Sequence, residues 1–443
     1  MRKIFLIITA VCFLVNMNAQ ETVLPAPPNK GVTYIKNANI HTGTGKTISN
    51  GVIKISNGKI EAVGTAAEVP VPADATVVDA KGKEVYPGLI LPTSNLGLVE
   101  VSSVRATTDS RELGELNPNV RSLVAYNTDS KVINTLRSNG ILMANIVPDG
   151  SLLAGSSSVV QLDAWTWDDA AYKTDEGIHL YVPSLLARPG GGRFGGGAGR
   201  GGPQAERDLV KEGLEKIEGI KSFFREAKAY HDAPSHTETN LKFESVKGLF
   251  AKTQKLYLHA NTVKQLLVAF DFIKEFNFDI VIVGGSDSWQ VADLLKQHNV
   301  PVILQQPHSL PTLDDDDVDQ PYKTAAMLQK AGVLFTISDD DGQTRGRNLP
   351  FNAGTAVAYG LTKEEALQAI TLNAAKILGV ADKAGSIEVG KDANIIISDG
   401  DILDMRTSNV TAAFIQGRQI DLTDKHKLLN ERYEEKYKLK KAF

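Results

Sequence analysis

Cysteine is nearly missing from this sequence, because Cys12 is the only one among 443 residues. A disulfide needs two cysteines, and a thiolate nucleophile or metal ligand needs at least one in the folded chain. Cys12 lies in an N-terminal segment that we expect to be removed, so the mature chain would have none. Any transition-metal site must therefore use other side chains, and His, Asp, Glu and Lys are the candidates.

An excess of positive charge is also missing. The formal net charge is −4 and the pI is about 6.1. Proteins that bind nucleic acid usually present a basic face, so we expect no nucleic acid partner. The remaining composition, with 42% hydrophobic and 23% charged residues, is typical of a globular protein.

A long apolar segment is absent from the N-terminus. The run from Ile4 to Val15 is shorter than the ~20 residues that span a bilayer. Basic residues precede it, and the small residue Ala19 stands before a possible cleavage site ahead of Gln20. This pattern predicts a secretory signal peptide over residues 1–19, export to the periplasm or beyond, and no stable membrane anchor. An uncleaved anchor is one alternative. A lipoprotein is disfavoured, because valine and not Gly or Ala precedes Cys12.

Short strands with turns between them are predicted at both ends of the chain. The β-rich runs are residues 33–35, 52–55, 60–63, 76–78, 394–398 and 411–415. Asn57-Gly58 is a strong hairpin signal, and Gln416-Gly417 marks a second turn. We expect the two ends to assemble one small β-domain.

Strand and helix signals alternate between these two ends. The apolar runs are residues 141–147, 256–258, 279–283, 300–304 and 333–337. A further strand, the fourth, is expected near Leu180 to Leu186. Residues 263–276 keep a helical spacing, and Thr362 with Glu365 forms a capping box. This alternation predicts a parallel sheet or barrel.

A glycine-rich tract, residues 189–203, interrupts the alternation. Such a segment cannot build a core. Arginine–glycine segments also occur in RNA-binding proteins, but a chain without a basic face favours a flexible loop. A charged helix is expected after it, at about residues 205–230. Residues 426–443 are expected to form a charged C-terminal helix or tail.

Three segments carry a more specific pattern. Residues 56–64 are SNGKIEAVG, residues 85–97 are VYPGLILPTSNLG, and residues 385–394 are GSIEVGKDAN. Together they resemble the amidohydrolase superfamily, most closely its imidazolonepropionase-like branch. The resemblance implies an α/β fold, a TIM-type (βα)8 barrel with a small composite β-sandwich domain. The implied domains are residues 20–84 with 385–425 for the composite domain and residues 85–384 for the barrel.

The resemblance also implies a metal site, although two of its ligands differ here. In this branch two histidines of strand 1, one of strand 5 and an aspartate of strand 8 bind the metal. Thr93 and Asn95 stand at the two strand 1 positions, whereas His259 and Asp339 match the other two. Gly284 stands where a strand 6 histidine commonly assists. The resemblance therefore implies one divalent metal, Zn or Fe, on His259 and Asp339, or a site that has lost its metal.

Each of these residues has a structural alternative. His259 is explained equally well as a buried histidine that hydrogen-bonds within the barrel. Asp339 has the alternative of a capping or turn carboxylate, and Asp340 and Asp341 follow it directly, so the strand 8 register stays open.

Further site residues follow from the same alignment. Asp339 and His308 are the predicted catalytic groups. The predicted substrate-binding residues are Thr93, Asn95, Asn261, Ser286, Arg345 and Arg347. The two arginines could bind a substrate carboxylate or phosphate, or they could pair with the carboxylates of residues 339–341.

Two functions are compatible with this pattern. The resemblance implies metal-dependent hydrolysis of C–N bonds other than peptide bonds, in small cyclic amides or N-acyl compounds. The alternative is a non-catalytic exported binding or regulatory subunit that partners an intact relative. In both cases we expect a homo-oligomer, or a hetero-oligomer with an amidohydrolase relative.

Overall fold

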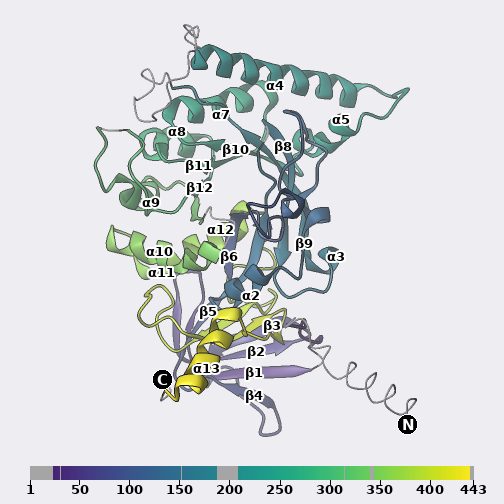
Figure 1. Ribbon diagram of the computed structural model, residues 1–443. Helices are drawn as coiled ribbons and strands as arrows, with labels where there is room; N and C mark the ends of the chain where they lie inside the picture. The colour runs from purple at the N-terminus through teal and green to yellow at the C-terminus, as the bar shows by residue number, and fades with distance from the viewer. Residues whose placement is uncertain are drawn as a thin grey trace, which may run out of the picture.

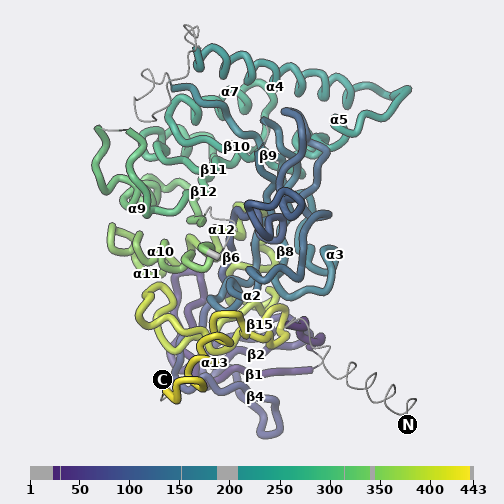
Figure 2. The backbone as a smooth tube through the Cα atoms, viewed as in Figure 1, coloured from purple at the N-terminus to yellow at the C-terminus, as the bar shows by residue number. Residues whose placement is uncertain are grey.

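Two eight-stranded sheets organise the molecule. The computed structural model describes residues 23–29, 31–150, 152–186, 208–313, 315–339 and 344–439, so the predicted signal peptide and glycine-rich loop lie outside it. One sheet lies at one end of the molecule, the second occupies the middle, and α4 (Leu209–Asp232) crosses the opposite end (Figure 1). Figure 2 shows that the purple N-terminal and yellow C-terminal segments gather at the same end.

The first sheet joins the two ends of the chain, as predicted. Its strands are β1 (Val32–His41), β2 (Thr47–Ser56), β3 (Lys59–Thr65), β4 (Thr76–Asp79), β5 (Glu84–Pro87), β14 (Ile395–Ser398), β15 (Val410–Ile415) and β16 (Arg418–Gln419). The order is β16-β15-β14-β5-β1-β2-β3, and β4 also pairs with β1. Asn57 and Gly58 have φ angles of 50° and 79°, as a tight hairpin turn requires.

The second sheet is a nearly closed barrel. Its strands are β6 (Leu89–Ser94), β7 (Ile141–Ile146), β8 (Leu153–Gln161), β9 (Ala171–Tyr181), β10 (Lys255–Ala260), β11 (Ile280–Gly284), β12 (Val302–Leu304) and β13 (Phe335–Ile337). They follow one another in chain order from β6 to β13. Thr93 Oγ1 lies 2.7 Å from Ser338 Oγ and brings the two edges together. The predicted barrel fold is confirmed.

The barrel departs from the expected pattern between β7 and β9. β8 runs antiparallel to both neighbours, so strict βα alternation is interrupted there. The expected fourth strand near residues 180–186 was misplaced, because β9 spans Ala171–Tyr181. Its first half is polar and partly exposed, and it therefore gives no apolar run that would mark it in the sequence.

Most of the helices around the barrel lie on one side of its strands in the view of Figure 1. Their bounds are α2 (Lys131–Arg137), α3 (Trp167–Ala170), α5 (Leu241–Ser245), α6 (Lys247–Phe250), α7 (Val263–Phe276), α8 (Ala292–Gln297), α9 (Gln320–Ala331), α10 (Leu349–Ala358), α11 (Lys363–Ala369), α12 (Leu372–Ile377) and α13 (Lys425–Tyr437). The 3₁₀ turns are η1 (Arg105–Thr107), η2 (Ser122–Ala125), η3 (Ser288–Val291) and η4 (Thr344–Asn348). The predicted capping box is present at α11. Within the described residues, no helix combines the length and the apolar character that crossing a membrane requires.

Apolar side chains fill the amino-terminal end of the barrel. Ile90, Met143, Val159 and Tyr257 from four strands pack in one buried cluster with residues of α12. Lys255, the first residue of β10, donates to the carbonyl oxygen of Ile377 at the end of α12. This end is closed, so a site must lie at the carboxyl ends of the strands, as is usual in such barrels.

A buried carboxylate ties the barrel to the first sheet. Asp163, just after β8, accepts hydrogen bonds from Arg137 Nη1 at 2.5 Å and from Arg418 Nη1 at 3.0 Å. The backbone N–H of Ala26 donates to the same carboxylate at 2.9 Å. Asp163 is fully buried, and it therefore holds together the N-terminal segment, α2 and β16.

Candidate active site at the carboxyl ends of the strands

Thr93 and Asn95, which stand at the two strand 1 histidine positions, are held by neutral or acidic partners. Thr93 is buried and its hydroxyl is paired with Ser338 across the barrel seam. Asn95 Nδ2 donates to Asp149 Oδ2 at 3.3 Å, whereas Asn95 Oδ1 is buried and has no protein partner among the described residues. An amide oxygen without a partner is costly unless a ligand or ordered water meets it.

His259, the last residue but one of β10, lies beside a second histidine. Its Nε2 lies 2.9 Å from Nδ1 of His179 on β9, so one ring donates an N–H to the other. Tyr181 stacks on His259 with ring centroids 3.8 Å apart, and Tyr257 stacks on His179 at 4.8 Å. This arrangement agrees with the alternative in which His259 is a buried histidine that hydrogen-bonds within the barrel. Its partner, His179, was not indicated by the sequence.

Both imidazoles are neutral at physiological pH. Burial lowers the pKa of His259 to about 3. Burial, and then the nearby His259, lowers the pKa of His179 well below its usual value. A neutral imidazole can accept or donate a hydrogen bond, but it adds no positive charge to the site.

Asp339 lies two residues after β13 and is 1% exposed. Its Oδ2 accepts a hydrogen bond from Asn352 Nδ2 on α10 at 3.1 Å. Asn352 thus fixes the orientation of a carboxylate that is buried and not on the surface. Asp340 and Asp341, the alternatives for strand 8, lie outside the described residues.

Two predicted substrate-binding residues contact each other. Ser286, after β11, donates its hydroxyl proton to Asn261 Oδ1 at 3.2 Å, and Asn261 follows β10. Gly284, the last residue of β11, lies against Asn261. A β-carbon there would be 2.3 Å from Asn261 Oδ1, and its φ is +101°. The site is therefore built around a glycine at the position of the strand 6 histidine.

The remaining predicted site residues, His308, Arg345 and Arg347, are exposed or half-buried. His308 is exposed, and its Nε2 is 2.9 Å from Thr355 Oγ1 on α10. Arg345 is exposed and Arg347 is half-buried, both in η4. None of the three lines the pocket described below.

Three buried polar residues at the barrel wall were missed in the sequence. Asn145, Ser157 and His179 are each 0% exposed and come from β7, β8 and β9. Both amide atoms of Asn145, Ser157 Oγ and His179 Nε2 have no protein partner among the described residues. A polar residue inside an otherwise buried strand is the signal that could have found them. His179 was missed because the fourth strand was predicted at the wrong position. Ser157 was missed because β8 was not predicted at all.

The described residues do not supply the metal sphere that the resemblance implies. Among them, no three His, Cys, Asp or Glu side chains are placed to hold one ion. Thr93 and Asn95 offer only neutral oxygen and nitrogen atoms, which bind zinc weakly. A catalytic zinc site usually needs about three protein ligands. The side chains that the structure describes therefore do not fit such a site.

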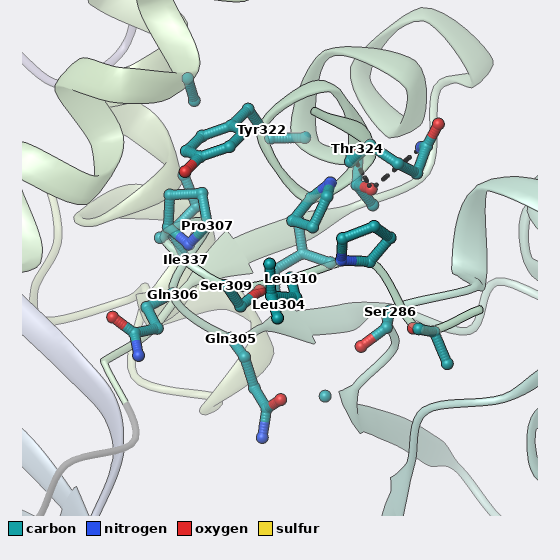
Figure 3. Close-up of a pocket in the computed structure, with 17 residues that line it drawn as sticks. Ser286, Leu304, Gln305, Gln306, Pro307, Ser309, Leu310, Tyr322, Thr324 and Ile337 are labelled. Atoms are coloured by element: carbon teal, nitrogen blue, oxygen red, sulfur yellow. Dashed lines mark hydrogen bonds between the residues drawn. The ribbon is translucent and has the colours of Figure 1, made fainter. Parts of the chain in front are cut away.

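A pocket opens at the carboxyl ends of β11, β12 and β13. Gly284, Leu304 and Ile337, at those strand ends, form part of its wall, and the segment after β12 forms the rest together with the start of α9. About 580 Å³ of empty space, part of it open to solvent, lies among these residues. Figure 3 shows Ser286 and Gln305 at one edge of this pocket and Tyr322 at the opposite edge.

Sequence comparison identifies the group to which this barrel belongs. The family described as the amidohydrolase family matches residues 178–420, more than half of the chain. The chain belongs to the amidohydrolase family. The predicted membership of the amidohydrolase superfamily is thereby confirmed, and the matched region includes the third sequence motif, residues 385–394.

Curated relatives of this amidohydrolase are longer than the region they share with it. Amidohydrolase tasK of Hapsidospora irregularis is 23% identical over 370 residues, covering 75% of this chain and 36% of that relative. Imidazolonepropionase of Thermoplasma volcanium is 31% identical over 212 residues, covering 45% of this chain and 48% of that relative. The chain thus spans less than half the length of either.

A solved structure resembles the whole barrel. The amidohydrolase from Thermotoga maritima is 26% identical, covers 88% of this chain and 99% of its own, and superposes with a TM-score of 0.74. This chain therefore shares the fold of that amidohydrolase over 88% of its own length.

Proposed function

We propose that this amidohydrolase hydrolyses a carbon–nitrogen bond other than a peptide bond, in a small cyclic amide or N-acyl compound. The observation that carries the proposal is Asp339. It is a 1% exposed carboxylate at the carboxyl end of β13, oriented by Asn352. The imidazolonepropionase and amidohydrolase relatives support the reaction class.

The proposed chemistry uses the residues that the site contains. Asp339 acts as the general base: its carboxylate takes a proton from a water whose oxygen forms a bond to the substrate carbonyl carbon. When the C–N bond breaks, the protonated Asp339 gives that proton to the leaving nitrogen, so that the carboxylate is regenerated. Asn352 fixes the orientation of the carboxylate through its amide. His259, neutral because its pKa is about 3, donates or accepts a hydrogen bond at the other side of the mouth. The pocket beside β11–β13 holds the rest of the substrate.

Turnover by the full-length protein tests the proposal. We would measure hydrolysis of a panel of lactams, cyclic ureides and N-acyl amines, with and without a chelator. Removing a general base costs about 10²–10⁴-fold in rate, so Asp339→Asn should lose at least ~100-fold. Asp293→Asn on the exposed face of α8 is the matched control and should retain full activity. Equal turnover in Asp339→Asn and the control would contradict the role of Asp339.

The second candidate is a non-catalytic binding or regulatory subunit, favoured by the lack of a three-ligand group among the described side chains. Elemental analysis and the same panel separate the two. A protein without metal and without turnover, which co-purifies with an intact amidohydrolase from its own cells, would support the subunit. Chelator-sensitive turnover would exclude it.

A further inference from the structure

The pocket at β11–β13 is lined by neutral groups. Among the seventeen described residues that form it, none is Asp, Glu, Lys, Arg or His. Its apolar surface comes from Leu304, Ile337 and several prolines, and its polar groups are amides and hydroxyls such as those of Gln305 and Gln306. A ligand in it meets hydrogen-bond donors and acceptors but no full charge.

The three cationic residues predicted for the site, His308, Arg345 and Arg347, do not line this pocket. His308 belongs to the same segment as Gln305 and Gln306, yet its ring is hydrogen-bonded to Thr355 of α10. The two arginines of η4 do not line the pocket. A carboxylate or phosphate entering here would lose its hydration and gain no opposite charge from the lining, which disfavours its binding.

The amide side chains match one type of ligand. A glutamine side chain presents an N–H donor and a C=O acceptor side by side, and a substrate amide carries the complementary pair. Pro307, Pro311 and Pro321 in the wall restrict the backbone, so the pocket is pre-shaped and costs little ordering on binding.

We propose that this pocket selects an uncharged substrate group, an amide carried on an apolar or aromatic body, and discriminates against a carboxylate at the same position. The inference rests on the proposed function for identifying this pocket as the substrate site. It differs from the expectation that Arg345 and Arg347 bind an anionic substrate group.

Equilibrium binding to the full-length protein tests the inference without any need for turnover. The probes are N-acetylphenylalaninamide and N-acetylphenylalanine at pH 7.5, which are matched in shape and differ in charge. We expect the neutral probe to bind at least ~10-fold more tightly, a difference equivalent to about one hydrogen bond to a charged group. Gln306→Lys, which adds a cation to the lining, should reverse the preference. Gln297→Lys on the exposed end of α8 is the matched control and should leave it unchanged.

The outcomes separate the inference from the proposed function. Equal or tighter binding of the carboxylate by the wild-type protein overturns the inference, as does failure of both probes to bind at millimolar concentration. Selective binding of the neutral probe without turnover of any amide supports the inference and contradicts the proposed function. Turnover that depends on Asp339 but prefers anionic substrates supports the proposed function and contradicts the inference. The wild-type comparison stands even if the Gln306→Lys protein fails to fold.

Discussion

His179 and His259 share one hydrogen bond, and this bond limits what either ring can do. The Nδ1 of His179 and the Nε2 of His259 lie 2.9 Å apart, so a proton already occupies the space between them. If both rings became charged, two donors would face each other, which burial in the barrel disfavours. The pair is therefore a neutral unit, and its protonation must be linked to unfolding or to ligand binding.

Acid should destabilise the protein through this pair. The folded pKa of His259 is about 3, whereas an unfolded histidine titrates near 6.5. Between those values the unfolded chain binds a proton that the folded chain does not. His259 alone should therefore lower the free energy of unfolding by up to ~1.4 kcal/mol per pH unit as the pH falls from about 6.5. His179, whose pKa burial also lowers, adds to the slope in the same direction, and neither histidine contributes at higher pH. Urea unfolding at pH 4.5 to 7.5 measures this slope.

The matched variants isolate the contribution of the pair. The double variant His179→Asn, His259→Asn should lose this part of the slope, because asparagine does not titrate. His308→Asn, at an exposed position, should keep the wild-type slope. Identical slopes in all three proteins would show that the pair is protonated in the folded state.

Asn145 should be more stabilising than a leucine of similar size. It is 0% exposed, and neither amide atom has a protein partner among the described residues. Buried polar atoms of this kind normally bind ordered water or a ligand. Asn145→Leu removes those bonds and should lower the free energy of unfolding by ~1–3 kcal/mol. Met143→Leu on the same strand is the control and should cost less than ~1.5 kcal/mol. A more stable Asn145→Leu protein would mean that the amide is unsatisfied.

At the scale of single elements, apolar periodicity predicted most of the barrel. β7, β10, β11, β12 and β13 each contain a run of large apolar residues, and each was found within a few residues of its position. β8 is different, because Gly155 and three serines stand in the middle of a fully buried strand. Its burial comes from its position between β7 and β9 and not from its own side chains, so no local pattern could reveal it.

The sequence predicted site residues only at positions where this chain has the same residue type as the amidohydrolase motif. The sequence placed His259 and Asp339 at strand ends, and the structure places them there. It could not predict that His179 would bond to His259, because these residues are 80 positions apart and come from neighbouring strands. Nor could it predict that Gly284 leaves no room for a side chain, which depends on the three-dimensional position of Asn261.

Gly284 should not tolerate even one added carbon. Its φ is +101°, and a β-carbon would be 2.3 Å from Asn261 Oδ1. Gly284→Ala should lower the free energy of unfolding by at least ~1–2 kcal/mol. Gly219 on α4 offers a control of opposite sign, because a β-carbon there meets nothing within 4 Å. Gly219→Ala should stabilise by ~0.4–1 kcal/mol. If Gly284→Ala were as stable as the wild-type protein, the strand 6 position could be rebuilt with histidine.

At the scale of the whole molecule, one carboxylate couples the two sheets. Asp163 accepts hydrogen bonds from Arg137 of α2 and Arg418 of β16, and all three side chains are largely buried. Both guanidiniums pair with this one carboxylate, and each loses its ionic partner if the carboxylate is removed. The attachment of the composite sheet to the barrel therefore depends strongly on a single residue.

Replacing this carboxylate should be far more costly than replacing a surface one. Asp163→Ala leaves two buried guanidiniums unpaired, and breaking a buried pair in this way costs ~3–5 kcal/mol. Asp271→Ala, which breaks an exposed pair with Lys221, is the control and should change stability little. Thermal and urea unfolding measure both. Similar losses of unfolding free energy in the two variants would mean that Asp163 does not hold the two sheets together.

The antiparallel β8 also has a consequence for the order in which the barrel forms. β7, β8 and β9 are joined by short connections, so residues 141–181 can pair locally, with little loop-closure entropy to lose. The seam at Thr93 and Ser338 joins residues 245 positions apart and can close only after the intervening chain has folded. We therefore expect β7, β8 and β9 to pair early in folding and the seam between β6 and β13 to close last. In native-state hydrogen exchange, the amides of β6 and β13 should open at lower free energy than those of β7 and β8.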